Sequence, residues 1–562
     1  MSIIRGCFVI YFVLTYATTI SQNRDGLSLN EKKADSLLAI WNKNTPGVSV
    51  AVLKEGQIVY RNSKGLANLE YDIPVSDTTP FHAASLSKQF TAFCILLLQE
   101  KGLVSLDDDI RKYIPELPVY PQTITLRHLA THTSGLREQW RLLEMGGWRL
   151  DDVITKAQIL SLVYRQQSLN FMPGEKFMYC NTGFTLLAEV VERVTNISFS
   201  KFAQENIFAK LGMDHSFFFD DFEKLVKQRA YSYYKSGAEY KKSVLNYSIV
   251  GPTSLFTTSN DLLKWSGFLN APGEPFKKVI SLLNQRAKLN DGSISEAAMG
   301  QFTGFTLHGL EWFDHSGSDA GFRSHLARFP EYNASVAVLS NATPFNASAL
   351  AISLADIFLS DLYRNNAKSL QKPLFNHDPS KFISLSKNQL VIYCGKYWNP
   401  EEWYDREIKL INDTLVYIRP GGSTSKLVPV SVNEFKMLGD KEDVSVFFEK
   451  KNPDNFVMKL VINKQRTITF VKYQPTTPEM FTGDFFSDEL ASLLTFSTRQ
   501  GKLYAFHTRL GEFELMPINA SYLTSNNRNF KKIKLVRNKQ KKVIAIEVSN
   551  DGVSDMLFKA HQ

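Results

Sequence analysis

A serine and a lysine stand three residues apart in Ser85-Leu86-Ser87-Lys88, at the start of an apolar stretch. In a helix, both side chains would lie on one face, one turn apart. A serine hydroxyl is a weak nucleophile until a neighbouring base removes its proton. A lysine can be that base if burial and nearby positive charge lower its pKa by about three units, which represents roughly 4 kcal/mol. The pair therefore predicts Ser85 as a nucleophile and Lys88 as its base.

This four-residue pattern is not specific by itself. The pattern Ser-x-Ser-Lys also begins at Ser198, Ser384 and Ser423. Only the Ser85 copy follows a strand-like approach and opens a core helix. The stretch at residues 92–102 of this predicted helix is apolar nearly all round and ends at a glycine. We interpret the other three, in polar, helix-edge or barrel settings, as chance matches.

A tyrosine and an asparagine, Tyr179 and Asn181, precede an amphipathic helix predicted at residues 183–196. A phenol near a lysine can move a proton to or from a leaving group. The asparagine faces the same way in an extended loop and could hold a substrate amide. The spacing alone is weak evidence, because it recurs at Tyr60 and at Tyr363.

A third motif, His315-Ser316-Gly317, is the one His-x-Gly pattern in the chain. In an edge strand beside the nucleophile, the glycine would let a substrate backbone approach closely. The backbone N–H of Ser318 could join that of Ser85 in holding an oxyanion, and such donors are worth about 10²- to 10³-fold each in rate. A lone histidine is more often structural than functional, so His315 is a candidate only because the other two motifs accompany it.

The elements that must position these residues lie between about residues 30 and 365. Residues 48–62 and 325–341 each predict a pair of antiparallel strands around a turn, and the two helices lie between these pairs. Helices and antiparallel hairpins in one unit predict an α+β domain.

Beyond a polar stretch the chain changes to short alternating strands and repeats itself. Three landmarks recur 88 residues further along: Gly395 as Gly483, Leu415 as Leu503, and Pro429 as Pro517. A constant offset indicates a repeat, and about 85 residues suffice for a small closed antiparallel barrel. We predict a serine hydrolase domain over residues 22–365, a linker over 366–388, and β-barrels over 389–475 and 476–562.

Composition narrows the class of protein. The chain is 44% hydrophobic and 22% charged, which is typical of an ordinary globular protein. Its 562 residues are too many for a single hydrophobic core, so several domains are expected. The densest basic stretch, residues 531–542, could attract an anionic wall polymer, nucleic acid or lipid. Its alternating apolar residues and lack of aromatic residues favour a solvated strand pair, so we expect no nucleic-acid partner.

The amino terminus has one positive charge followed by an apolar run of signal-peptide length. The run is shorter than the roughly 20 residues of a spanning helix. We therefore expect a cleaved signal peptide over residues 1–21 and a secreted or periplasmic protein. Of four cysteines three would remain, widely scattered, which predicts neither a disulfide framework nor a zinc site. No metal or organic cofactor is implied.

Together with their flanks, the three motifs resemble the serine β-lactamase-like family, which includes class C β-lactamases, D-alanyl-D-alanine carboxypeptidases, D-aminopeptidases and related esterases. The matching stretches are DTTPFHAASLSKQFTA, GLVSLDDDIRKYIPELP, ITLRHLATHTSGL, PGEKFMYCNTGFTLLAEVVERVT, LFTTSNDLLKW and DHSGSDAGFRS. They run in family order across about residues 30–362. The resemblance implies a β-lactamase/transpeptidase-like domain, with an antiparallel sheet, helices and a helical subdomain.

The resemblance also implies roles for individual residues. It implies Ser85 as nucleophile, Lys88 and Tyr179 as the proton-transfer pair, Asn181, His315 and Gly317 as substrate contacts, and the Ser85 and Ser318 amides as the oxyanion hole. His132 lies in a loop signature of the family and is interpreted as structural. Cys180 stands where the family often has serine, and its side chain is expected to point away from the substrate.

One departure from the family pattern bears on substrate. The β-lactamases usually have lysine where this chain has His315, and histidine is typical of the carboxypeptidase, D-aminopeptidase and esterase branches. A neutral imidazole pairs less strongly with a penicillin carboxylate. The layout of one such domain before two barrels is most similar to D-aminopeptidases. A barrel loop would then enter the cleft and select the substrate; alternatively the barrels only support the domain or form the contact of a homodimer.

We therefore expect a secreted hydrolase that forms an acyl-serine on short D-amino-acid peptides, amides or carboxyl esters. β-Lactams are expected as acylating ligands. The alternatives are a carboxylesterase or weak β-lactamase of the same family and, outside enzymes, a penicillin-binding receptor for wall peptides.

Overall fold

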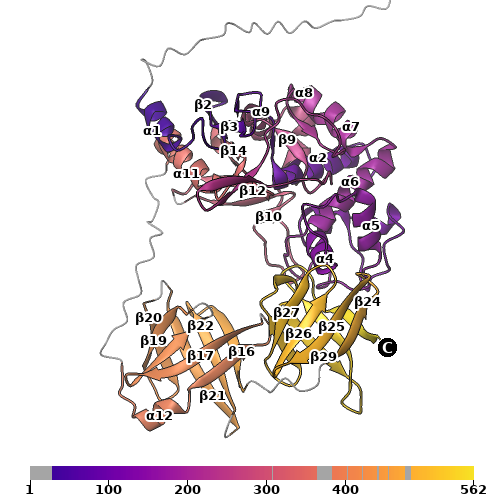
Figure 1. The fold of residues 1–562 in the computed structure, drawn as a ribbon. Coiled ribbons are helices and arrows are strands. Elements are labelled where there is room, and N and C mark those ends of the chain that lie inside the picture. Colours follow the sequence, from indigo (N-terminus) through magenta and orange to yellow (C-terminus); the bar gives the residue numbers. More distant parts are fainter. Residues whose placement is uncertain are drawn as a thin grey trace, which may run out of the picture.

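The computed structural model describes residues 28–306, 308–363, 382–401, 403–419, 422–439, 442–452, 455–474 and 482–561. The predicted signal peptide and most of the predicted linker lie outside these residues. Within them, no helix has the length and apolar character needed to cross a membrane. Figure 1 shows a first domain of helices and strands, followed by two barrels that we call barrel 1 and barrel 2.

A seven-stranded antiparallel sheet forms the centre of the first domain. In spatial order its strands are β10 (Ala297–Ala298), β11 (Gln301–Phe305), β12 (Glu311–Asp319), β13 (Phe322–Phe329), β14 (Ala334–Ser340), β1 (Val48–Lys54) and β2 (Gln57–Lys64). The neighbouring strands β14 and β1 are rich in valine and alanine and are buried along nearly their whole length. Small and β-branched side chains suit a strand that is covered on both faces.

Helices cover both faces of this sheet. On one face, α1 (Leu29–Leu37) and α11 (Ala347–Phe358) pack against each other, and α11 packs on β13 and β14. On the other face, α9 (Ser259–Asn270) packs on β1 and β14 and adjoins a group of helices beside the sheet. The remaining helices of the domain are α2 (Ser87–Glu100), α3 (Leu126–Ala130), α4 (Gln139–Met145), α5 (Lys156–Tyr164), α6 (Asn181–Thr195), α7 (Phe199–Ala203), α8 (Ala209–Leu211) and α10 (Lys277–Leu283).

The helix α2 carries the first motif. It starts at Ser87, five residues before the apolar stretch that begins at residue 92, so Lys88 lies in its first turn as predicted. Nearly every residue of α2 is buried, which explains why it is apolar nearly all round. The helix ends at Glu100, and Gly102 follows with a φ of +68° that favours glycine.

Three small sheets complete the first domain. The first contains β5 (Phe81–His82), β9 (Leu255–Thr257) and β6 (Phe217–Phe218). The second contains β15 (Ala342–Thr343), β7 (Tyr233–Ser236) and β8 (Glu239–Lys242). The third contains β3 (Leu66–Asn68) and β4 (Ile73–Pro74). The β5–β9 pairing holds the strand that leads directly to Ser85.

Each barrel closes with eight antiparallel strands, which confirms the predicted α+β domain followed by two antiparallel barrels. Barrel 1 follows α12 (Lys387–Val391) and contains β16 (Gly395–Asn399), β17 (Tyr404–Ile411), β18 (Thr414–Ile418), β19 (Thr424–Pro429), β20 (Glu434–Leu438), β21 (Val444–Asn452), β22 (Asn455–Ile462) and β23 (Arg466–Tyr473). Barrel 2 contains β24 (Gly483–Ser487), β25 (Ser492–Arg499), β26 (Lys502–His507), β27 (Gly511–Pro517), β28 (Tyr522–Ser525), β29 (Lys532–Arg537), β30 (Val543–Ser549) and β31 (Met556–His561).

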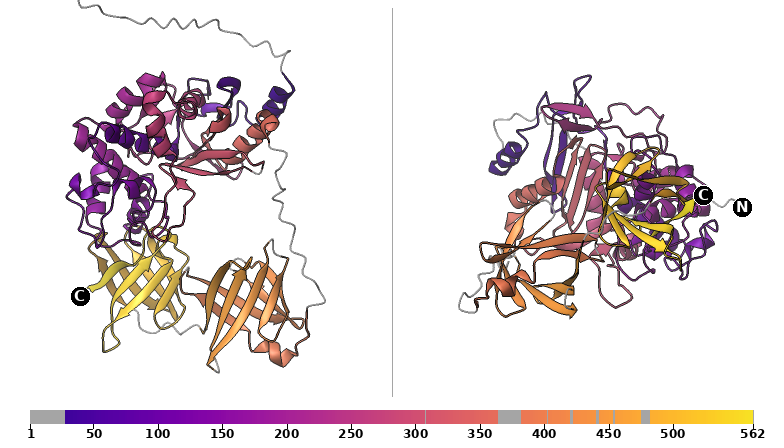
Figure 2. Two further views of the ribbon diagram at one scale, coloured as in Figure 1. Left: turned by 180° about the vertical axis from the view of Figure 1, so that it is seen from behind. Right: turned by 60° about the horizontal axis from the view of Figure 1, so that its bottom comes forward.

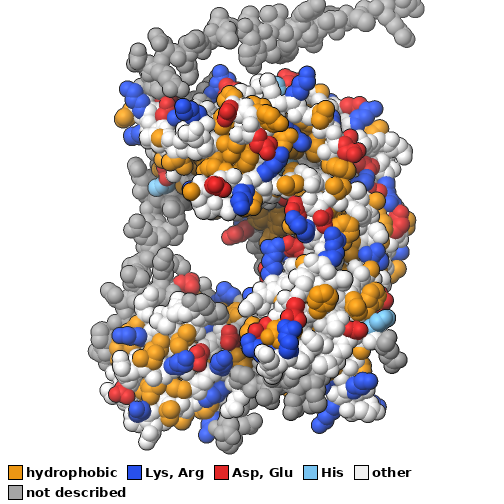
Figure 3. Space-filling view, in the orientation of Figure 1, with side chains coloured by type: hydrophobic (Ala, Val, Ile, Leu, Met, Phe, Trp, Pro, Cys, Tyr) orange, Lys and Arg blue, Asp and Glu red, His pale blue; other side chains and the backbone are white. Residues whose placement is uncertain are grey.

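The two barrels occupy different positions. Barrel 2 lies against the helical part of the first domain near α4, and barrel 1 lies beside barrel 2 and apart from the first domain (Figures 1 and 2). Most of the buried apolar residues of barrel 2 belong to the larger of the two apolar clusters of the first domain, whereas barrel 1 has a cluster of its own. On the face shown in Figure 3, Lys and Arg side chains are interspersed with Asp and Glu.

Candidate active site

The nucleophile candidate, Ser85, lies on a strained turn between β5 and α2. It is the middle residue of a short 3₁₀ helix, Ala84–Leu86, and Ala84 has a φ of +49°. Residues other than glycine rarely adopt this conformation, and such strain is concentrated at functional sites. Two bonds hold the turn: the Ala84 N–H donates to His82 Nδ1 at 3.2 Å, and the Ala83 N–H donates to the Leu255 carbonyl at 2.7 Å.

The side chain of Lys88 is fully buried and lies beside Ser85. Its Nζ is 3.1 Å from Ser85 Oγ and donates to Asn181 Oδ1 at 2.7 Å and to the Pro252 carbonyl at 2.8 Å. Burial lowers the pKa of Lys88 to about 7, against the opposing effect of the Asp319 carboxylate. Near neutral pH a large fraction of the amine is therefore uncharged and could accept the Ser85 proton.

The phenol of Tyr179 lies close to this pair. Its ring centroid is 4.8 Å from Lys88 Nζ, and burial raises the pKa of Tyr179, so the phenol keeps its proton. The imidazole of His132 stacks on the Tyr179 ring at 4.3 Å, and its Nδ1 accepts from the Cys180 N–H at 3.0 Å. Burial holds the pKa of His132 well below its usual range. A neutral His132 therefore orients the Tyr179 loop.

The amide of Asn181 links Lys88 to a buried acid. Asn181 begins α6, and while its Oδ1 accepts from Lys88, its Nδ2 donates to Glu138 Oε1 at 2.8 Å. Burial raises the pKa of Glu138. In the structure Asn181 thus orients the base, and its contact with substrate stays a prediction. The sequence analysis missed Glu138, which follows the THTSGL signature closely but matches no catalytic spacing.

The strand β12 passes beside Ser85 with one free edge. It pairs with β13 along its length but with β11 only up to Asp314, so from His315 to Asp319 its outer edge has no strand neighbour among the described residues. A Cβ at Gly317 would lie 2.3 Å from the Ala83 carbonyl oxygen and 2.1 Å from Ser324 Oγ. Glycine is required here because β12 packs directly against the segment that precedes the nucleophile.

The imidazole of His315 is neutral in this site. Its Nδ1 donates to the Ser316 carbonyl at 2.6 Å, and burial, aided by the Lys88 charge, lowers the pKa of His315 to about 3. Its buried Nε2 has no hydrogen-bond partner within the described residues, which leaves a lone pair for a donor on a ligand. His315 can therefore accept a hydrogen bond but cannot supply positive charge.

These residues surround a pocket of about 500 Å³. Its walls contain Ser85, Glu138, Trp140, Arg141, Leu150, Tyr179, Asn181, Tyr247, Thr253, Phe302, His315, Ser316, Ser318, Asp319, Asp551 and Gly552. The predicted oxyanion donors Ser85 and Ser318 thus share one pocket, although their use as donors stays a prediction. The sequence analysis also missed Asp319, whose carboxylate accepts hydrogen bonds from Tyr247 Oη and, at 2.6 Å, from Thr253 Oγ1.

The last two residues of that wall come from barrel 2, from the loop between β30 and β31. The Gly552 carbonyl accepts from the Glu138 N–H and from Asn170 Nδ2, each at 2.9 Å. A Cβ at Gly552 would lie 2.7 Å from the Cβ of Glu138. This close approach brings Asp551 to the pocket. Its sequence signal was only a turn-forming Asn-Asp-Gly triplet at residues 550–552.

The pocket offers no cluster of metal ligands. Nowhere in the described parts of the chain do three His, Cys, Asp or Glu side chains gather in an arrangement that could hold a metal ion. The groups available for chemistry are a hydroxyl, a buried amine, a phenol and carboxylates, a set that suits acyl transfer to Ser85.

Comparison with known proteins gives matches over the first domain. The family model described as Beta-lactamase matches residues 30–357. The D-aminopeptidase of Gluconobacter oxydans (strain 621H) is 26% identical over 299 residues, which are 53% of this chain and 56% of that protein. Penicillin-binding protein 4* of Bacillus subtilis (strain 168) is 27% identical over 311 residues, 52% of this chain and 67% of that protein. The matches thus span little more than half of the D-aminopeptidase.

Solved structures support the fold alone. The octameric penicillin-binding protein homologue from Pyrococcus abyssi aligns with a TM-score of 0.53 and 24% identity, covering 78% of this chain and 99% of that chain. FmtA from Staphylococcus aureus aligns with a TM-score of 0.50 and 20% identity, covering 61% of this chain and 90% of that chain.

Proposed function

This chain belongs to the beta-lactamase family of serine hydrolases, and we propose that it acts through an acyl-serine intermediate on short D-amino-acid peptides, amides or carboxyl esters. The observation that carries the proposal is the fully buried Lys88 Nζ, 3.1 Å from Ser85 Oγ, whose pKa burial lowers to about 7. A lysine that is partly uncharged at neutral pH is the base that a serine nucleophile requires.

The proposed reaction has two steps. Lys88 takes the proton from Ser85 Oγ, which bonds to the substrate carbonyl carbon, while the backbone N–H groups of Ser85 and Ser318 stabilise the oxyanion. The proton then passes from Lys88, by way of the Tyr179 hydroxyl, to the leaving group as its bond breaks. In the second step the oxygen of a water molecule bonds to the acyl carbon while one water proton passes to Lys88. The bond from that carbon to Ser85 Oγ then breaks, the carboxylic acid leaves, and Lys88 returns the proton to Ser85 Oγ.

The charges of the pocket favour a substrate with a free amino group. Glu138, Asp319 and Asp551 stand against one cation in the wall, Arg141, whose Nη1 already pairs with Glu144 at 2.8 Å. A neutral His315 offers no charge to the carboxylate of a penicillin. We propose that Asp551, at the pocket edge, pairs with the substrate ammonium group. The match to a D-aminopeptidase supports this substrate class.

A substrate panel tests the proposal. The kcat/KM for D-alanine p-nitroanilide should exceed that for its N-acetyl derivative by at least about tenfold, because acetylation removes the charge that Asp551 would pair with. Asp551→Asn should reduce this preference, while Asp488→Asn, an exposed acid elsewhere on barrel 2, should leave it unchanged. Equal hydrolysis of both compounds, or a preference that is unchanged in Asp551→Asn, would contradict the proposal that Asp551 binds the substrate ammonium group.

We also propose that the protein is exported, on the basis of the apolar run at the amino terminus. Mass spectrometry of the native protein from its host should give a mature chain that begins near Gln22. A chain that retains residues 1–21 would contradict export with cleavage.

A further inference from the structure

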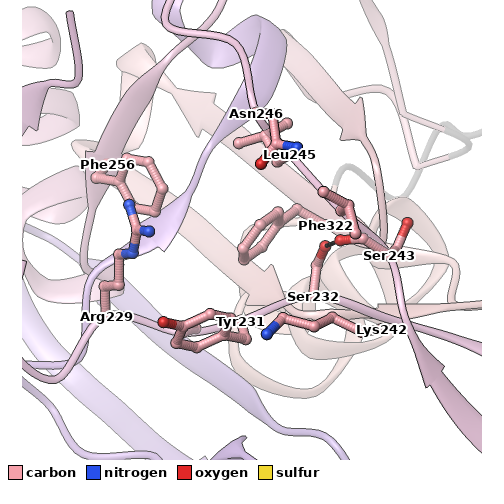
Figure 4. Close-up of a pocket in the computed structure, with 11 residues that line it drawn as sticks. Arg229, Tyr231, Ser232, Lys242, Ser243, Leu245, Asn246, Phe256 and Phe322 are labelled. Atoms are coloured by element: carbon pink, nitrogen blue, oxygen red, sulfur yellow. Dashed lines mark hydrogen bonds between the residues drawn. The ribbon is translucent and has the colours of Figure 1, made fainter. Parts of the chain in front are cut away.

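A second cavity, of about 280 Å³, lies in the first domain outside the pocket around Ser85, and the two have no wall residue in common. Residues 229–232 and 242–246 enclose it, and Phe256 and Phe322 give it an apolar wall (Figure 4). Both phenylalanine side chains are almost wholly buried. This volume is just below the range of about 300–1,000 Å³ that is typical of small-molecule sites, so the cavity suits a small ligand.

The guanidinium of Arg229 forms part of this cavity and has no anionic partner among the residues that the structure describes. Its centre lies 4.9 Å from the ring centroid of Phe219, 5.7 Å from that of Tyr231 and 5.8 Å from that of Phe256. Across the described parts of the chain, no residue forms a hydrogen bond or ion pair with Arg229. Five N–H donors held among aromatic rings are thus left for a ligand.

A second cation faces the same cavity. Lys242, the last residue of β8, has its Nζ 4.5 Å from the ring centroid of Tyr231. Figure 4 shows Arg229 and Lys242 on opposite sides of Tyr231. The ion pair of Lys242 with Glu70, at 3.4 Å, is between two side chains that are each about half exposed, so it is weak. The eleven wall residues contain these two cations and no acid.

We propose that this cavity binds an organic carboxylate with an apolar or aromatic body. The planar fork of Arg229 matches a carboxylate through two parallel N–H bonds, and Lys242 adds a second positive charge. The body of the ligand packs on Phe256 and Phe322. The carboxylate comes either from a free small molecule or from the carboxyl terminus of a peptide, and the site is independent of whether Ser85 is acylated.

Ligand-observed NMR titration of the full chain tests the proposal, with phenylacetate as the probe and phenylacetamide as its neutral counterpart. Phenylacetate should bind at least about tenfold more tightly than phenylacetamide, since charge-assisted bonds to arginine are lost with the amide. Arg229→Gln should weaken phenylacetate binding by a similar factor. Lys227→Gln, which removes the same charge at an exposed position two residues away, should not.

Three results would overturn the proposal: no binding of phenylacetate, equal binding of both probes, or equal losses in Arg229→Gln and Lys227→Gln. Far-ultraviolet circular dichroism reports whether each variant folds. If Arg229→Gln does not fold, phenylacetate binding is measured instead on Lys242→Gln, which should weaken it. The control is Lys241→Gln, because this residue lies on the opposite face of the same strand.

A competition experiment between phenylacetate and peptide substrates identifies the source of the carboxylate. If the ligand is a substrate's carboxyl terminus, phenylacetate should raise the KM of peptides with a free carboxyl terminus but not of their amidated forms. If it is a separate small molecule, phenylacetate should bind without this competition. Both results support the site. Binding can also be measured on Ser85→Ala, so failure of the proposed hydrolysis would not affect the outcome.

Discussion

The two barrels are copies of one another that differ in what they contact. Gly395 and Gly483 open them with φ values of +142° and +139°, and the predicted repeat landmarks fall at the same strands in both. Yet barrel 2 shares an apolar core with the first domain and reaches the pocket. Among the described residues, the aromatic rings of barrel 1 that contact another domain are Trp398 and Trp403, which both lie against Tyr522 of barrel 2. The repeat therefore determines the fold of each barrel but not its interface.

One matched pair of positions illustrates this difference. Glu489 of barrel 2 pairs with the buried Arg137 at 2.8 Å and accepts from the Gln167 N–H at 2.8 Å. Glu401, 88 residues earlier in barrel 1, is exposed. The same residue type at the same place in the repeat thus holds an interface in one copy and faces solvent in the other.

The largest expected effect comes from removing that interface charge. Glu489→Gln leaves the buried guanidinium of Arg137 without its counter-charge and should lower the free energy of unfolding by about 3 kcal/mol. Glu401→Gln, the matched change in barrel 1, should have an effect near zero. Urea unfolding of both variants measures the difference. Equal losses would mean that the Arg137 pair does not distinguish the two barrels.

The next effect concerns the barrel 2 loop at the pocket. In Gly552→Ala the new methyl group meets Glu138, so the loop must shift, and kcat/KM should fall about tenfold if this overpacking costs about 1.4 kcal/mol. Gly273→Ala is the control, because a Cβ there meets nothing nearer than 3.9 Å. Steady-state hydrolysis of a D-alanyl ester measures both. Unchanged activity in Gly552→Ala would show that the position of the barrel 2 loop does not affect hydrolysis at Ser85.

The pH dependence of kcat/KM should respond to residues that affect proton transfer but not to Asp551 of barrel 2. With the pKa of Lys88 lowered to about 7, the protonated amine cannot accept a proton, so kcat/KM should fall about tenfold per pH unit below pH 7. The Glu138 carboxylate raises this pKa, so Glu138→Gln should move the midpoint to lower pH. Asp551→Asn should leave the midpoint in place. A midpoint that follows Asp551 instead would contradict this division of roles.

The smallest effect is expected where the barrels meet. The ring of Trp403 lies 5.1 Å from that of Tyr522, and Trp403→Ala should cost about 0.5–1.5 kcal/mol at this contact. Barrel 1 should become more accessible to a protease while kcat/KM stays within about twofold. Loss of activity in this variant would show that barrel 1 supports the site through barrel 2.

Much of this architecture could be predicted because its signals are local. Strand alternation and the spacing of Ser85 to Lys88 each occupy a short stretch, and the 88-residue repeat is found by comparing the chain with itself. The prediction that the motif opens a core helix is confirmed, because α2 starts at Ser87, five residues before the apolar stretch that begins at residue 92.

The acids around the pocket could not be predicted in the same way. Glu138, Asp319 and Asp551 converge from a helix cap, a strand end and a loop of another domain. Their effects depend on tertiary contacts such as the bond from the Glu138 N–H to the Gly552 carbonyl, for which a single sequence has no periodic signal.

Intact mass spectrometry tests the central claim, that Ser85 is the acylated nucleophile, most directly. The purified full chain is exposed briefly to the p-nitrophenyl ester of N-acetyl-D-alanine and compared with Ser85→Ala under the same conditions. The account predicts an acyl adduct on the wild-type chain, and in Ser85→Ala neither adduct nor turnover with an unchanged unfolding temperature. An adduct or full turnover in folded Ser85→Ala, or no acylation of the wild-type chain by any activated ester, would contradict it; the last result would favour a receptor that binds wall peptides without cleaving them.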